Sequence, residues 1–116
     1  MLQPDALKGA SEVYIIERDP KPGDYPDPAC EYILPESDIV IMTASAAINK
    51  TLPRLLELSK NAVSIIIGPT TPLCPELKAL GIDRLSGMVV RDKAAFEAWA
   101  TANHGSPYKH GDVFMI

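Results

Sequence analysis

The segment AVSIIIGPTTPLCP, residues 62–75, constrains the fold more than any other part of the chain. Its first half is uncharged and rich in valine and isoleucine, which is typical of a strand buried on both faces of a sheet. A Gly-Pro pair then ends the strand abruptly. Ligands in open α/β sheets bind beyond the carboxyl ends of strands. The hydroxyls of Thr70 and Thr71 and the thiol of Cys74 therefore follow the strand at a position typical of a ligand site.

Strand-like and helix-like segments alternate along the rest of the chain. Short apolar runs predict strands at residues 12–17, 38–43, 62–67 and 85–90, and the final VFMI is a candidate further strand. Capping residues and apolar stripes predict helices that begin near Asp27, Thr51, Pro75 and Asp92. This alternation predicts an α/β fold with a Rossmann-like, doubly wound, mostly parallel sheet of about four to five strands.

Length and composition limit the class of protein. The chain has 116 residues, which suits one domain, and its formal net charge of −4 argues against a nucleic-acid partner. Its apolar runs are too short to span a bilayer and its N-terminus does not resemble a signal peptide, so we expect a cytoplasmic protein with no membrane partner. Cys30 and Cys74 form no CxxC pair, which argues against a disulfide scaffold or a zinc ribbon.

The sequence lacks the usual nucleotide-binding fingerprint. A nucleotide-binding βαβ unit opens with a strand and a glycine-rich turn, but the chain contains neither GxGxxG nor GxxxxGKS/T. Residues 1–9 look like the end of the helix that would follow such a turn. We therefore expect the sheet to lack its first strand.

Polar side chains cluster in the turn after the second predicted strand, residues 43–51. The hydroxyls of Thr43 and Ser45, the amide of Asn49 and a helix start at Thr51 predict a polar cup for an anion or a carbonyl group. The alternative is that Thr51 caps the helix and that Asn49 holds the turn through its own side chain.

The turn after the third predicted strand, residues 68–75, offers a second set of ligand-binding groups. Gly68, Pro69, Thr70 and Thr71 bring hydroxyls and backbone N–H groups to a position suited to an oxyanion or a phosphate. The alternative is a rigid turn whose shape is fixed by its prolines.

Cys74 and Glu17 are further candidates. A thiol near a helix start has a lowered pKa, so Cys74 is a candidate metal ligand or nucleophile, or else a cap or a small buried side chain. Glu17 ends the first predicted strand, where an acid binds ribose hydroxyls or another polar ligand in dinucleotide folds; the alternative is a solvated carboxylate. His104, His110 and Asp112 match no known metal-binding spacing.

Three segments together resemble one family. Residues 15–29, 34–52 and 68–77, with Asn-x-Thr after the second predicted strand and GPTTP after the third, are similar to the C-terminal, Rossmann-like domain of the putative heavy-metal chelation family. Members usually carry an N-terminal domain similar to the N-terminal part of enolase, with the proposed site between the domains. The resemblance implies that residues 1–116 form a single Rossmann-like domain, a truncated C-terminal portion of a two-domain protein. It also implies a heavy or transition metal ion as the cofactor.

Two positions depart from the family pattern. Family members tend to have glycine where this chain has Lys50, and often where it has Ala44. Both side chains therefore add bulk beside the site that the resemblance implies.

We predict a heavy-metal chelation or small-ligand-binding domain that holds its ligand in the turns 43–51 and 68–75. One alternative is an enzyme that acts on a small anionic substrate in the same cleft, with Cys74 or Glu17 taking part. Another is a non-catalytic remnant that acts in oligomerisation, because a sheet without its first strand exposes backbone edges. The expected partners are a small molecule or metal, and either further copies of this chain or a separate chain that supplies the missing strand and domain.

Overall fold

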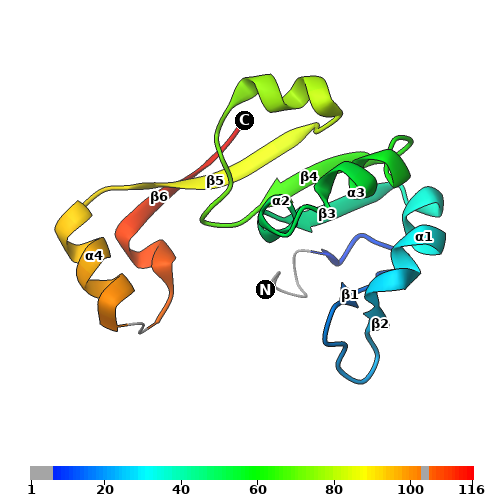
Figure 1. Cartoon of the computed structure of the whole chain (residues 1–116), viewed down its shortest axis with the longest axis horizontal. Coiled ribbons are helices and arrows are strands. Elements are labelled where there is room, and N and C mark those ends of the chain that lie inside the picture. Colours follow the sequence, from blue (N-terminus) through cyan, green and yellow to red (C-terminus); the bar gives the residue numbers. More distant parts are fainter. Residues whose placement is uncertain (1–6, 103–104) are drawn as a thin grey trace.

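A four-stranded sheet forms the centre of the molecule. The computed structural model describes residues 7–102 and 105–116; the helix end expected at residues 1–9 lies mostly outside them, and His104 lies wholly outside them. The strands, in spatial order, are β3 (Ile39–Thr43), β4 (Val63–Ile67), β5 (Arg84–Val90) and β6 (Gly111–Met115). β3, β4 and β5 are parallel, and β6 is antiparallel to β5 (Figure 1). The predicted mostly parallel α/β fold is confirmed, and VFMI contributes to β6.

The predicted helices are present, and most of them are short. The α-helices are α1 (Cys30–Ile33), α2 (Ser45–Ile48), α3 (Leu52–Leu58) and α4 (Lys93–Ala102); the 3-10 helices are η2 (Asp27–Ala29), η3 (Leu34–Glu36), η4 (Pro75–Leu80) and η5 (Pro107–His110). Asp92 Oδ1 accepts a hydrogen bond from Ala95 N–H at 3.1 Å, so the predicted cap of α4 is confirmed. Asp27 lies inside η2, which has no side-chain cap, so the cap predicted there is wrong. None of the helices among the described residues is long and apolar enough to cross a membrane.

The strand predicted at residues 12–17 is only partly formed. β1 (Ile16–Glu17) pairs in parallel with β2 (Tyr25–Pro26) in a separate two-stranded sheet. Just before β1, the Ile15 carbonyl accepts a hydrogen bond from Tyr25 N–H at 2.7 Å. The first predicted strand is therefore not part of the four-stranded sheet in the described residues.

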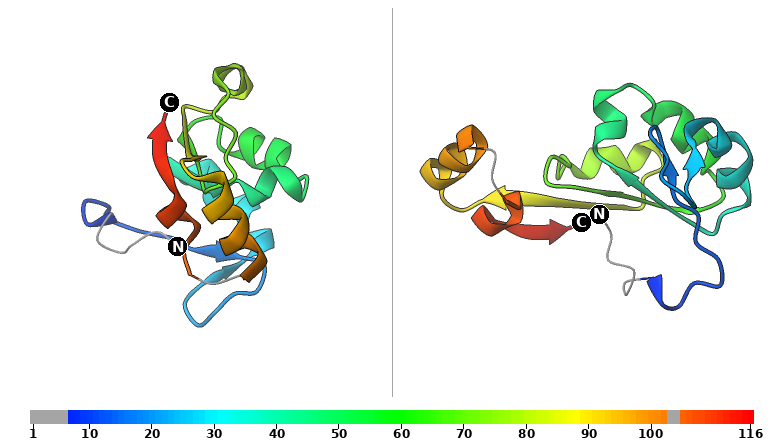
Figure 2. Two further views of the ribbon diagram at one scale, coloured as in Figure 1. Left: turned by 90° about the vertical axis from the view of Figure 1, so that its left-hand side faces the viewer. Right: turned by 90° about the horizontal axis from the view of Figure 1, so that it is seen from below.

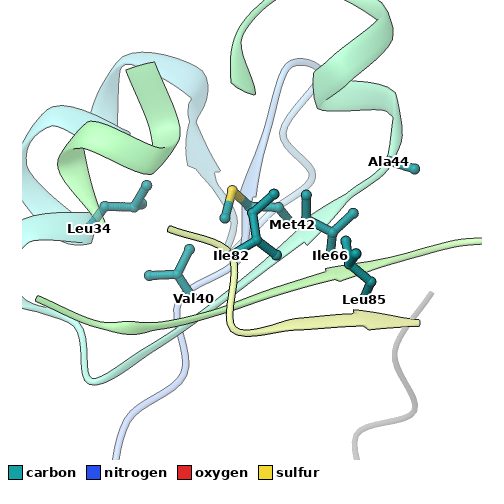
Figure 3. Close-up of a cluster of buried hydrophobic side chains, with 7 residues drawn as sticks. All are labelled: Leu34, Val40, Met42, Ala44, Ile66, Ile82 and Leu85. Carbon is teal, nitrogen blue, oxygen red and sulfur yellow. The ribbon is translucent and has the colours of Figure 1, made fainter. Parts of the chain in front are cut away.

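The connections between the parallel strands lie on one face of the sheet. The order β3-β4-β5 does not reverse, and right-handed crossovers that advance in one direction place their helices on the same face. The core cluster on that face consists of Leu34, Val40, Met42, Ala44, Ile66, Ile82 and Leu85 (Figure 3). The leucines predicted to form the apolar stripe of α3 pack against this cluster, namely Leu52, Leu55, Leu56 and Leu58.

The opposite face of the sheet is open among the described residues. Burial alternates along β3 and β4, so Val40 and Ile66 are buried while Ile39 is 60% exposed and Val63 is 47% exposed. The expectation that these strands are buried on both faces is therefore wrong. The physical reason is the strand order, because winding in one direction covers only one face.

The far end of the β5–β6 hairpin extends away from the core as an arm, which we define as α4, η5 and the adjoining ends of β5 and β6 (Figures 1 and 2). Phe96 and Trp99 lie in the arm with ring centroids 5.3 Å apart, and α4 has no fully buried residue. These two aromatic residues therefore belong to the arm and not to the core cluster. The radius of gyration, 15.3 Å, exceeds the roughly 13 Å expected for a compact chain of this length, as an extended arm requires.

Candidate functional site

The two predicted ligand turns begin side by side at the carboxyl ends of β3 and β4. Ala44 N–H donates a hydrogen bond to the Ile67 carbonyl at 2.9 Å, which ties the start of the first turn to the end of β4. Gly68 follows directly, and a Cβ at this position would lie 3.7 Å from the Ala44 Cβ. Two turns that are distant in sequence thus form one continuous wall at the carboxyl ends of β3 and β4, because neighbouring parallel strands end on the same side of the sheet.

Gly68 and Thr71 close the second turn. Thr71 N–H donates a hydrogen bond to the Gly68 carbonyl at 3.1 Å, and Gly68 has a φ of 133°, which favours glycine. A Cβ at Gly68 would lie 3.8 Å from Thr71 Oγ1. The Thr71 hydroxyl therefore lies inside the turn, on the side where Gly68 meets Ala44.

The Thr71 hydroxyl is the most unusual polar group of this wall. The residue is only 5% exposed, and its Oγ1 atom has no hydrogen-bond partner among the described residues. Leaving a buried hydroxyl unpaired costs about 1–3 kcal/mol, and native proteins pair most such groups. A bound ligand that accepts or donates a hydrogen bond at this position would remove that cost.

Gly87 of β5 explains why the second turn lies so close to the sheet. A Cβ at Gly87 would be 2.6 Å from the Thr71 carbonyl oxygen and 3.1 Å from Leu73 Cγ, so no larger residue fits without movement. A glycine in a strand often marks such a close backbone approach. Gly87 was not among the predicted site residues. Its position inside a predicted strand could have indicated a close backbone approach.

Thr43 and Ser45 form the exposed rim of the wall. Their hydroxyl oxygens are 2.5 Å apart and hydrogen-bonded to each other, and both residues are exposed. Thr70 is also exposed, whereas Pro69 is half-buried. The rim therefore offers hydroxyl groups that a ligand can reach from solvent.

Asn49 and Thr51 are engaged with each other. Asn49 Oδ1 accepts hydrogen bonds from Thr51 N–H at 3.2 Å and from the Thr51 hydroxyl at 2.6 Å. The prediction that Asn49 holds the turn is confirmed. Thr51 occupies the N-cap position of α3, as predicted, but its side chain makes no capping hydrogen bond, because its hydroxyl donates to Asn49 Oδ1 instead. The turn also contains the short helix α2, which was not predicted.

Lys50 adopts a backbone conformation that favours glycine. Its φ is 65°, in the left-handed region. This conformation costs about 1–2 kcal/mol for an L-residue other than glycine. Glycine was the residue that the resemblance implied at this position, so the departure adds backbone strain as well as bulk.

The surroundings of Cys74 raise the pKa of its thiol. Its Sγ donates a hydrogen bond to Glu76 Oε2 at 2.8 Å, and this bond is the main reason that the pKa of Cys74 is raised. The same bond lowers the pKa of the Glu76 carboxyl. The expectation of a lowered thiol pKa is therefore wrong, because the adjacent carboxylate outweighs the effect of the short η4 helix.

The described residues do not fit a metal centre. Among residues 7–102 and 105–116, no group of three or more His, Cys, Asp and Glu side chains is placed to hold a metal ion. Cys74 and Glu76 supply only two donors, and protein zinc sites usually take at least three protein ligands. In the tail, Asp112 pairs with Arg91 at 3.2 Å, and the His110 ring lies 6.4 Å from the Trp99 ring.

Glu17 is not brought to the wall by strand pairing. It belongs to the two-stranded β1–β2 sheet, where it is paired with Pro26, and it is exposed. The wall lies in the four-stranded sheet. The ribose role predicted for Glu17 stays a prediction.

Comparison with known proteins decides the family. The model of the DUF364 family, described as putative heavy-metal chelation, matches residues 2–112. The chain belongs to the DUF364 family. The resemblance stated from the sequence is thereby confirmed, and the Asn-x-Thr turn and the GPTTP turn that carried it are the two halves of the wall.

Two solved DUF364 structures are similar to this chain along its whole length. The protein from Desulfitobacterium hafniense is 40% identical with a TM-score of 0.89, and the one from Pyrococcus horikoshii is 29% identical with a TM-score of 0.88; both are described as proteins of unknown function. An uncharacterized protein of Methanocaldococcus jannaschii, MJ0500, is 37% identical over 87 residues, which is 70% of this chain. The chain covers 50% and 52% of the two solved relatives and 33% of MJ0500.

Proposed function

We propose that this DUF364 chain is a small-ligand-binding domain whose turns 43–51 and 68–75 hold an anionic ligand at the carboxyl ends of β3 and β4. The observation that carries this proposal is the Thr71 hydroxyl, which belongs to a residue only 5% exposed and has no hydrogen-bond partner in the described part of the chain. The exposed hydroxyls of Thr43, Ser45 and Thr70 supply further donors on the same wall. Hydroxyl and backbone N–H donors at such a position suit oxyanions.

The family description names heavy-metal chelation, and the donor chemistry of this chain narrows that description. Heavy and transition metals prefer thiolate and imidazole ligands, whereas the wall offers hydroxyls, and the nearby Cys74 thiol keeps its proton beside Glu76. We therefore infer that the described residues bind an anion rather than a free metal ion. The raised pKa of Cys74 equally disfavours an enzyme that uses this thiol as its nucleophile.

Thermal unfolding with inorganic phosphate tests the proposal. A ligand that binds only the folded state stabilises it by about 1.4 kcal/mol at ten times its Kd, so phosphate is expected to raise the Tm by several degrees. Thr71→Val keeps the shape of the side chain but removes the hydroxyl. This variant is expected to match or exceed the wild-type Tm without phosphate and to lose the phosphate response.

Ser59→Ala is the matched control. Ser59 is 1% exposed, and its Oγ is also unpaired within residues 7–102 and 105–116. It lies at the end of α3, where its carbonyl accepts a hydrogen bond from Ala62 N–H, next to the end of β4 opposite the wall. Ser59→Ala is therefore expected to keep the full phosphate response. A phosphate response that survives Thr71→Val, or a Thr71-dependent response to Zn²⁺ without phosphate, would contradict the proposal. A cytoplasmic location and the absence of a nucleic-acid partner remain predictions from composition.

A further inference from the structure

Among the described residues, β3 is an edge strand, so half of its backbone N–H and C=O groups face no neighbouring strand. Val63 N–H donates to the Asp38 carbonyl and Ala44 N–H donates to the Ile67 carbonyl, both at 2.9 Å. In a parallel ladder, alternate residues bond to the same neighbour, so the even-numbered residues of this stretch pair with β4. The N–H and C=O groups of Ile39, Ile41 and Thr43 therefore point to the open edge, where the order β3-β4-β5-β6 ends.

Ile39 and Ile41 of β3, together with the odd-numbered residues of β4, place apolar side chains on the uncovered face of the sheet. Ile39 is 60% exposed and Val63 is 47% exposed, and Ile41, Ile65 and Ile67 are half-buried. We call these five side chains the open face. Parallel sheets are normally covered on both faces, so an apolar face of this kind indicates a missing layer and not a surface adapted to water.

A second strand-forming segment is also incompletely covered. Val13, Tyr14 and Ile15 are 50%, 46% and 53% exposed, although they lead directly into β1. Ile16 packs against the core cluster to which β3 contributes Val40 and Met42. This segment therefore leads into a strand that packs against the same core as β3.

The solved relatives contain the amount of chain that such a layer requires. Both match this chain over its full length at TM-scores of 0.89 and 0.88, yet about half of each relative lies outside the match. The fold of this chain is thus shared with proteins that have about as much chain again.

We propose that the β3 edge and the open face together bind a strand–helix unit, and that the unmatched half of the DUF364 relatives supplies this unit. The strand pairs in parallel with β3 through Ile39, Ile41 and Thr43. The chain of this unit runs on from the strand away from β3, so its right-handed crossover places the helix on the open face, opposite to the connections that run from β3 to β4 and β5. The helix must carry an apolar stripe that matches Ile39, Val63 and Ile65.

Co-expression with the unmatched half of the Desulfitobacterium hafniense protein tests this proposal. A complex with one copy of each chain is expected by size-exclusion chromatography with light scattering. Ile39→Lys and Val63→Lys place a charge on the open face and are expected to weaken the complex at least tenfold. Leu80→Lys is the matched control, since Leu80 is also 60% exposed but belongs to η4, on the opposite side of the sheet, and it is expected to leave the complex intact.

Hydrogen exchange on this chain alone gives a second, independent measurement. The amides of Ile39 and Ile41 are expected to exchange fast in the isolated chain and to become protected in the complex, while the Val40 and Met42 amides are protected in both. Three outcomes would overturn the proposal: no complex on co-expression, a complex that Ile39→Lys leaves intact, or edge amides already protected in the isolated chain. Protection accompanied by a dimer of this chain would instead assign the face to a second copy.

Discussion

The thiol of Cys74 donates its hydrogen bond to a Glu76 carboxylate oxygen 2.8 Å away. Loss of the thiol proton would place two negative charges beside each other, so the pKa of Cys74 is raised above its ordinary value. Glu76→Gln removes one of these charges, and we expect the pKa of Cys74 to fall toward that of a free thiol. The pH dependence of iodoacetamide labelling, measured in a Cys30→Ser background, reports this change.

The direction of the labelling change follows from thiolate reactivity. Only the thiolate reacts, so at a fixed mildly alkaline pH the Glu76→Gln variant is expected to label faster than the wild type. Glu97→Gln, in α4 of the arm, is the control and should leave the rate unchanged. Equal pH profiles for the wild type and Glu76→Gln would show that the carboxylate does not hold the proton on Cys74.

Residue chemistry was predictable from sequence only where it depends on near neighbours. Asn49 holding its turn follows from its own spacing to Thr51, and that prediction is confirmed. The distinction between Thr70, which is exposed, and Thr71, which is buried and unpaired, depends on β5, which lies beyond the turn in sequence. The effect of Glu76 on the pKa of Cys74 was not predicted, because the expectation considered the helix start and not the carboxylate two residues further on.

At the scale of elements, the turn 68–75 and strand β5 depend on each other through Gly87. A Cβ at Gly87 would stand 2.6 Å from the Thr71 carbonyl, so Gly87→Ala must push the turn away from the sheet or distort β5. Overpacking of this kind costs about 1–3 kcal/mol. We expect Gly87→Ala to lower the free energy of unfolding by this amount, measured by urea denaturation, and to weaken the phosphate response as well.

Gly9→Ala is the matched control for Gly87→Ala. A Cβ at Gly9 would meet no atom within 4 Å, so this substitution is expected to change the stability little and to keep the phosphate response. If Gly87→Ala lowers the stability but leaves phosphate binding intact, Thr71 does not need its present position to bind the ligand. That result would separate the fold of the turn from its proposed role.

The elements themselves were largely predictable, because their signals are local. β-branched runs located β3 and β4, the leucine stripe located α3, and Gly81 marked the end of η4 with a left-handed φ of 97°. The coverage of the sheet was not predictable from the same runs. A run such as residues 62–67 is uncharged on both sides, and only the strand order shows that one side remains uncovered by the described residues.

At the scale of the whole molecule, the arm and the core have different support. The core cluster is packed between the sheet and α3, whereas α4 has no fully buried residue and packs chiefly against η5. Regions with few buried apolar contacts open at lower free energy than the core does. The arm is therefore expected to unfold before the sheet, so this chain should depart from two-state unfolding.

Trp99, the single tryptophan of the chain, lies in the arm and reports its unfolding. Its indole N–H donates to the Gly105 carbonyl at 3.1 Å, so its fluorescence should change when α4 leaves the hairpin. We expect the urea midpoint of Trp99 fluorescence to lie below the concentration at which the β4 amides lose hydrogen-exchange protection. Ile66→Ala, at a core position 3% exposed, should lower β4 protection by about 2–5 kcal/mol and leave the Trp99 midpoint unchanged. Coincident transitions that shift together in this variant would show that the arm and the core form one cooperative unit.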